Sequence, residues 1–145
     1  MSRLIAFACT VLAVLGFTVP GTGAAAWAED GKLGIELNKL EDTDGACRAY
    51  LVYQNGTQMD FSALKIDLVM FGSDGVINRR LAVDGAPLRA GKTSVRLFDI
   101  RGLACAEIAR MLVNDVLECE QGGEAKGDCI DLVTTSSRAS AVLER

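Results

Sequence analysis

Alternation of apolar and polar side chains is the feature that most constrains this chain. It recurs in five segments between residues 33 and 100 and gives most of them one apolar face. A period of two residues is typical of half-buried strands, because successive side chains of a strand point to opposite faces. The predicted strands are 34–40, 47–55, 62–71, 76–83 and 93–100.

These strands are each expected to turn one set of side chains to a core. In the fifth segment Val95 and Leu97 alternate with Arg96 and Phe98, which predicts Val95 and Leu97 on its apolar face. The predicted sets in the other segments are Leu33, Ile35 and Leu37; Cys47, Ala49, Leu51 and Tyr53; Leu64, Ile66, Leu68 and Met70; and Ile77, Leu81 and Val83.

Turn-forming residues separate the predicted strands. Residues 72–75 read Gly-Ser-Asp-Gly, and Asp-Gly supplies the left-handed backbone that a tight hairpin needs. Residues 54–57, 84–87 and 90–91 are similarly rich in Asn, Asp, Gly and Pro. Strands that recur every roughly 8–15 residues with turns between them predict an all-β, antiparallel, immunoglobulin-like β-sandwich of about seven strands.

One segment departs from the period of two. Residues 105–112 place Ile108, Met111 and Leu112 at helical spacing among good helix formers, which predicts one short helix across the end of the sandwich. A strand over 115–119, a polar loop over 122–127 and a short strand over 129–134 follow. We expect residues 136–145 to be loose or to form a short tail helix.

The first 28 residues have the organisation of a secretory signal peptide. They contain one base, Arg3, no acid, an apolar run over 4–17, and the small residues Ala26 and Ala28 around Trp27. Cleavage after Ala28 would leave 29–145 as a single β-sandwich domain, with no transmembrane span, in the periplasm. Its net charge would change from −4 to −5, since only Arg3 is lost, and an acidic balance argues against nucleic acid as a partner.

Four of the five cysteines, Cys47, Cys105, Cys119 and Cys129, lie after this segment. Export makes disulfides the expected state, and four cysteines allow three pairings. In an up-and-down series of strands, the start of the second strand and the end of the fifth lie at one end. This order favours Cys47–Cys105 and Cys119–Cys129, with Cys105–Cys119 as the main rival.

Few residues suggest chemistry. The chain has no histidine, which excludes imidazole catalysis and histidine metal ligands. Residues 42–45, Asp-Thr-Asp-Gly, resemble the start of a calcium loop, but the twelfth position is Tyr53 rather than glutamate. Asp128 and Asp131 would face opposite ways on a strand, and Arg79-Arg80 is read as a solvated edge rather than an anion site. We therefore expect no catalytic residue, no metal and no cofactor.

Two further patterns are weak. Asn55-Gly56-Thr57 has the form of a glycosylation sequon, which matters only in a host that glycosylates exported proteins. Ser136-Ser137 has no base nearby in the sequence, so a hydrolytic serine is disfavoured.

From Leu33 to Cys129 the chain resembles a family of small periplasmic proteins of Gram-negative bacteria. Some of them are labelled only as twin-arginine (Tat) signal-sequence domain proteins. The residues that carry the resemblance are 37–41, 45–48, 74–77, 98–100, Cys105, 114–116, Cys119 and 128–129. The resemblance implies a periplasmic location and no activity, and the single Arg3 departs from the twin-arginine label.

The main hypothesis is therefore a non-enzymatic periplasmic interaction (accessory or adaptor) domain, stapled by two disulfides, that presents an edge strand or loops to an unidentified envelope protein. The alternative is a periplasmic protein that binds a small molecule or ion with the loops around Asn55 and residues 122–127 at the sandwich ends. A thiol-redox or hydrolytic enzyme is the third and least favoured class.

Overall fold

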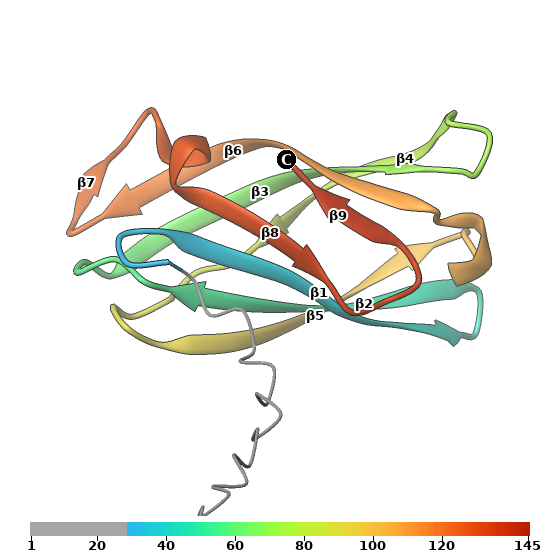
Figure 1. Ribbon diagram of the computed structural model, residues 1–145, viewed down its shortest axis with the longest axis horizontal. Helices are drawn as coiled ribbons and strands as arrows, with labels where there is room; N and C mark the ends of the chain where they lie inside the picture. The colour runs from blue at the N-terminus through green and yellow to red at the C-terminus, as the bar shows by residue number, and fades with distance from the viewer. Residues whose placement is uncertain (1–28) are drawn as a thin grey trace, which may run out of the picture.

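The computed structural model describes residues 29–145 and shows two stacked β-sheets (Figure 1). The predicted signal peptide, residues 1–28, lies outside the described residues. Sheet A has the strand order β5-β2-β1-β8, and sheet B has the order β4-β3-β6-β7 with β9 also paired to β6. The predicted β-sandwich is confirmed. The strands are β1 (Leu33–Thr43), β2 (Ala46–Asn55), β3 (Phe61–Phe71), β4 (Ile77–Asp84), β5 (Thr93–Arg101), β6 (Arg110–Gln121), β7 (Glu124–Ala125), β8 (Val133–Ser137) and β9 (Val142–Glu144).

The core lies between the sheets and is built from the predicted alternating faces. The expected sets on β1, β2 and β3 are all buried, with Leu51, Ile66 and Leu68 fully so. The prediction is wrong for Ile77 and for Val95 and Leu97, which are exposed rather than buried, and Leu81 is only partly buried. The pairing of β3 with β4 shifts by one residue between Met70 and Phe71, and this irregularity turns Ile77 to the outer face.

The predicted helix over 105–112 is wrong. The described chain has a single 3-10 turn there, η1 (Cys105–Glu107), and β6 begins at Arg110. Met111 and Val113 are buried at alternate positions, and Met111 lies opposite Met70 of β3. Pairing with β3 and burial in the core therefore override the local helix propensity of this segment.

The C-terminal prediction is also wrong in its details. Residues 129–132 form a second 3-10 turn, η2 (Cys129–Leu132), in place of the start of a strand. The predicted loose tail is ordered instead as the end of β8 and as β9, with Ala141 and Leu143 buried. Both segments run parallel to their partners, β8 to β1 and β9 to β6, so the sandwich is not purely antiparallel.

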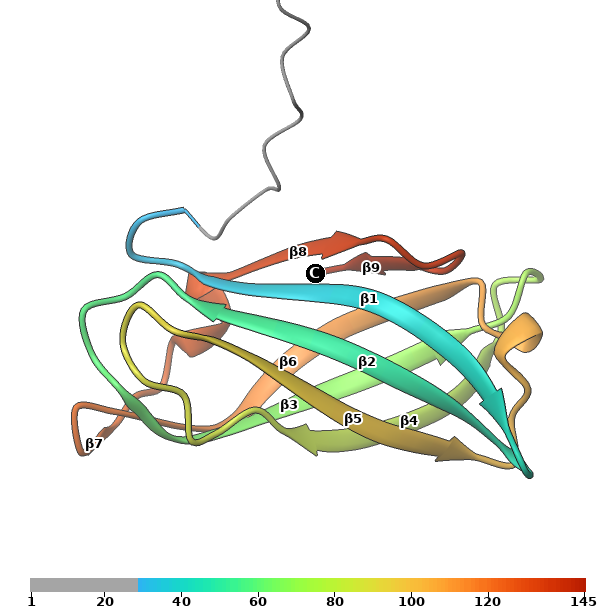
Figure 2. The same ribbon diagram turned by 90° about the horizontal axis from the view of Figure 1, so that it is seen from below.

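The two long sides of the sandwich differ. Figure 2 shows β8 and β9 along one side and β4 and β5 along the other. The chain passes from sheet A to sheet B between β8 and β9, and Ser137 donates a hydrogen bond to the Ala141 carbonyl across this connection. The chain therefore links the two sheets on both sides, through the β8–β9 connection on one and through residues 85–92 on the other, where β4 and β5 are the terminal strands of their sheets.

Both predicted disulfides form. Cys47 of β2 is joined to Cys105 in η1, and Cys119 of β6 is joined to Cys129 in η2. The first links residues 58 apart in the sequence and the second links residues 10 apart. The first bridge therefore restricts the unfolded chain more strongly.

This difference predicts unequal losses of stability. Replacing Cys47 and Cys105 together by serine should lower the free energy of unfolding by about 4 kcal/mol, and replacing Cys119 and Cys129 by about 3 kcal/mol, from the loop lengths alone. Urea unfolding followed by tyrosine fluorescence measures both. Equal losses, or a larger loss for the disulfide that closes the shorter loop, would contradict the prediction that Cys47–Cys105 contributes more stability.

Candidate functional site

Strand β5 is a long sheet edge. Its nine residues pair with β2 without any register shift, and β5 ends the order of sheet A. The backbone amide of Asn55 donates to the Lys92 carbonyl, and the backbone amide of Gly102 donates to the Gly45 carbonyl. These two bonds determine which residues of β5 are hydrogen-bonded to β2. Even-numbered residues of β5 therefore bond to β2, and the amides and carbonyls of residues 93, 95, 97, 99 and 101 point away from the sheet.

The outer face of this edge carries apolar side chains. Val95 and Leu97 are 51% and 52% exposed. Val95 lies opposite Val52, and Leu97 lies opposite Tyr50. Both are non-hydrogen-bonded pairs, in which the side chains lie closer together. We call these four residues the β5 edge face. It combines exposed apolar surface with unpaired backbone groups, which is the combination that sheet edges usually avoid.

A groove lies between the two terminal strands on this side. It has a volume of about 410 Å³. Residues of β4 and β5 line it, and Arg79 of β4 also reaches β5, where it donates to the Arg101 carbonyl at 2.9 Å. We call it the β4–β5 groove; its lining residues are Leu81, Ala82, Val83, Asp84, Arg96, Leu97, Phe98 and Asp99.

Two buried polar atoms beside the groove have no hydrogen-bond partner among the described residues. They are the Tyr53 hydroxyl and the Nε atom of Arg96. Arg96 also donates from Nη2 to the Pro87 carbonyl at 3.1 Å. The Tyr53 ring lies against Gly85, where a side chain would come within 2.9 Å of Cε1. Burial raises the pKa of Tyr53, while the nearby charges of Arg96 and Asp84 act in opposite directions.

Two aspartates near this side are paired with arginines. Arg48 donates to Asp99 through Nε and Nη2 at 2.7 and 3.1 Å, and this contact lowers the pKa of Asp99. Arg80 likewise binds both carboxylate oxygens of Asp67, at 2.9 and 2.8 Å, and lowers the pKa of Asp67. Both residues of the predicted Arg79-Arg80 edge therefore bind groups of the fold, since Arg79 donates to the Arg101 carbonyl.

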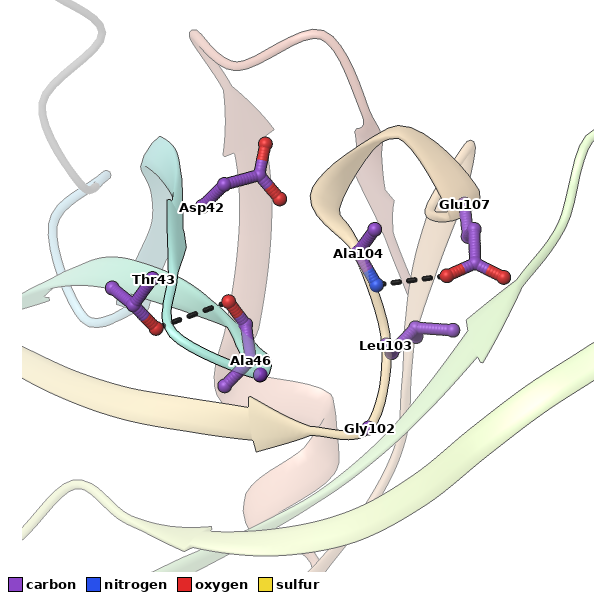
Figure 3. Close-up of a pocket in the computed structure, with 8 residues that line it drawn as sticks. Asp42, Thr43, Ala46, Gly102, Leu103, Ala104 and Glu107 are labelled. Carbon is purple, nitrogen blue, oxygen red and sulfur yellow. Dashed lines mark hydrogen bonds between the residues drawn. The ribbon is translucent and has the colours of Figure 1, made fainter.

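A second hollow, of about 280 Å³, lies at the end of the sandwich near η1 (Figure 3). Asp42 and Glu107 both line it. The Asp42 carboxylate accepts the Cys105 amide at 2.8 Å, and Glu107 accepts the Ala104 amide at 2.8 Å. The acids of this hollow therefore hold backbone amides, and residues 42–45 form the end of β1 and the turn into β2.

The structure brings together the loops named in the ligand-binding alternative. Gln121 donates to the Thr57 hydroxyl at 2.7 Å, and Thr57 donates to the Asn55 amide oxygen at 2.7 Å. The Asn55 amide nitrogen donates to the Met59 and Leu88 carbonyls. Asn55 is 2% exposed, so the sequon nitrogen is buried within the fold. These polar groups bind one another, and a smaller hollow of about 210 Å³ lies beside them between Gln121 and residues 126–132.

The remaining predicted residues also have structural positions. The predicted strand that holds Asp128 and Asp131 is the 3-10 turn η2 in the structure. Asp128 is its N-cap residue, and Asp131 lies within it. Ser136 and Ser137 lie in β8, where Ser137 bonds to backbone carbonyls. Within residues 29–145, no group of three or more acidic or cysteine side chains is placed to hold a metal, and no helix is long and apolar enough to cross a membrane.

Sequence reasoning did not identify the β4–β5 groove. The sequence does contain one signal. The fifth segment is apolar on both faces, whereas a strand at the end of a sheet needs only the one apolar face that packs on the core. Phe98 and Ile100 face the interior, which leaves Val95 and Leu97 outside. What the sequence lacked was the strand order, which places β5 at an edge and next to β4.

Comparisons with known proteins inform the fold alone. No protein-family model and no curated protein matches the chain. Among solved structures, IrmA from Escherichia coli is similar in fold, with a TM-score of 0.53 and 13% sequence identity. The match covers 72% of this chain and 90% of that one. It supports the β-sandwich.

The phase of the β5 ladder predicts an alternating pattern of amide hydrogen exchange. The amides of Val95, Leu97 and Asp99 should exchange rapidly, because they point away from β2, and those of Arg96 and Phe98 slowly. Residue-resolved NMR exchange measures this. Protection of Val95 and Leu97 in the dilute protein would show that the edge is already covered.

The unpaired Tyr53 hydroxyl predicts an unusual substitution effect. Tyr53→Phe should leave the free energy of unfolding unchanged, or raise it by up to about 1 kcal/mol, because a buried group without a partner is removed. A loss above about 1 kcal/mol would show that the hydroxyl is bonded. Tyr50→Phe is the matched control, since it removes a hydroxyl that donates to Glu41 and should lower stability.

The same variant has a distinct alkaline behaviour. The folded pKa of Tyr53 is raised above its unfolded value, so its contribution to stability is complete below about pH 10 and is lost as the pH rises further. Tyr53→Phe should therefore lose less stability than the parent above that pH. Urea unfolding at several alkaline pH values measures the difference.

Proposed function

We propose that this protein is a non-enzymatic interaction domain of the periplasm, and that the β5 edge face is the surface it presents to an envelope partner. The proposal rests on one observation: β5 has backbone amides and carbonyls that point away from the sheet, next to the half-exposed side chains of Val95 and Leu97. Addition of a partner strand to an exposed sheet edge is a common mode of recognition.

Two disulfides support the location, because such bonds persist in oxidising compartments. The predicted cleavage after Ala28 and the resemblance to small periplasmic proteins belong to the same proposal. The lack of histidine and the structural use of the candidate acids and serines within residues 29–145 support an accessory or adaptor role in this proposal.

We also infer that the sandwich is immunoglobulin-like. The neighbour order β5-β2-β1 corresponds to strands E, B and A of that fold, and β4-β3-β6 corresponds to C′, C and F. The parallel strands β8 and β9 would then be a C-terminal elaboration that covers the opposite side. This relation would leave the E and C′ edges exposed together, which is where the β4–β5 groove lies.

Site-specific photo-cross-linking in the native envelope tests the function. A photoreactive amino acid at Leu97 should join the protein to one stoichiometric partner, identified by mass spectrometry. The same probe at Leu117, which is equally exposed on β6, should give little or none of this product. Products from Leu117 alone would move the interaction to sheet B, and products from neither site would contradict the proposal.

The ligand-binding alternative has its own readout. A ligand held by the loops around Asn55 and residues 122–127 would stabilise the native state and raise the melting temperature in a ligand screen. Because the polar groups of these loops bind one another, we place this function second.

A further inference from the structure

We propose that the β4–β5 groove recognises an extended segment of a partner protein that carries a carboxylate, which adds to β5 as a strand and places its acidic side chain on Arg96. This inference rests on the proposed function and specifies the chemistry of the partner. The observations that support it are the direction of the β5 backbone, the unpaired Arg96 donor and the charge of the two strands.

The backbone determines where an added strand lies. The amides and carbonyls of Val95, Leu97 and Asp99 point outward, so a strand pairs with β5 by bonding to these residues. Of the two strands beside the groove, β5 is the more regular, since the pairing of β4 contains a register shift. An extended segment therefore fits β5 better than β4.

The register then determines which side chains meet. Cross-strand neighbours share a face of the sheet, so inward-facing residues of the added strand lie beside Arg96 and Phe98. Arg96 lines the groove and is half-buried, and its buried Nε has no partner, so the added strand would reach this donor by a rotation of the Arg96 side chain. A carboxylate accepts paired hydrogen bonds from a guanidinium better than any neutral group does.

The charges of the two strands favour an acid over a base. Together β4 and β5 carry four arginines and two aspartates, although the chain has a net charge of −4. Asp99 is neutralised by Arg48, whereas Arg79 and Arg96 donate to backbone carbonyls and form no ion pair within residues 29–145. Asp84 is the opposing acid on the groove, and its charge also acts on Lys65.

The pattern expected in the partner follows from these neighbours. One inward residue is acidic, to pair with Arg96, and the inward residue two positions away is apolar, to lie beside Phe98. Outward residues of the segment contact Val95 and Leu97. An extended stretch with an acidic and an apolar residue two positions apart is therefore the predicted recognition element.

A synthetic peptide tests this directly. The probe has the nine-residue length of β5, with a central aspartate, a valine two residues away on either side and threonine elsewhere. Its symmetry lets it pair in either direction. Matched peptides carry a central asparagine or lysine. Fluorescence anisotropy against the exported protein, with both disulfides intact, should give at least about tenfold weaker binding for the asparagine peptide and none for the lysine peptide.

Three variants separate the backbone from the side-chain contribution. Arg96→Gln should abolish the preference for aspartate over asparagine while weak binding remains. Leu97→Pro removes an outward amide that β2 does not use, so it should abolish binding of every peptide in a protein that still folds. Leu97→Thr keeps the amide and should still bind. Circular dichroism and urea unfolding confirm that each variant is folded.

Hydrogen exchange locates the bound peptide. Binding should slow exchange at Val95, Leu97 and Asp99, and protection confined to β4 or to another strand would overturn the proposal. Equal binding of the aspartate and asparagine peptides, or no binding at all, would also overturn it. Concentration-dependent protection of β5 without peptide would show that the occupant is a second copy of this chain.

These failures differ from a failure of the proposed function. If the peptides do not bind but the probe at Leu97 still cross-links an envelope partner, the interaction domain stands and only the acidic strand is rejected. If neither experiment gives a product, both proposals are rejected.

Discussion

The whole architecture depends on strand β6, which disulfides hold on both sides. Cys105 lies just before β6 and is bonded to β2 of the other sheet, and Cys119 lies near its end and is bonded to η2. Strand β6 pairs with β3, β7 and β9, more partners than any other described strand. Its first residues have helical propensity, but pairing with β3 keeps them extended and buries Met111 and Val113 in the core.

The C-terminal strands follow from this arrangement. β9 pairs with the start of β6, and β8 pairs with β1, so that the last residues connect the two sheets along one side. Arg110 contributes to the attachment, since it lies 4.0 Å from the Phe71 ring centroid and pairs with Glu144 at 2.6 Å. The chain also crosses between the sheets on the opposite side, where residues 85–92 join β4 to β5, and there the two strands end their sheets.

That opposite side combines features that usually oppose one another. A long regular edge invites association, and an inward-pointing charge such as Arg96 is a device that discourages it. A charge at this position discourages most added strands, since few would neutralise it. It admits a strand that carries a carboxylate, so one residue can both protect the edge and select the partner.

The sequence by itself determined the local patterns. Alternation identified the inward faces of β1, β2 and β3 and the two-sheet class, and the alternating direction of successive strands favoured Cys47–Cys105 and Cys119–Cys129 over the rival Cys105–Cys119. These features depend on residues close in sequence or on the direction of neighbouring strands. They could be predicted because burial of one face is a property that each strand carries by itself.

Only the tertiary structure decided the features that depend on distant pairing. Residues 110–112 became a strand through β3, residues 142–144 became a strand through β6, and Ile77 turned outward through a shift against Phe71. The candidate site is of the same kind, because the unpaired Arg96 and Tyr53 atoms arise where β4 and β5 come together from separate sheets. Local side-chain patterns carry no information on which strand ends a sheet, and that position decides which backbone groups remain available.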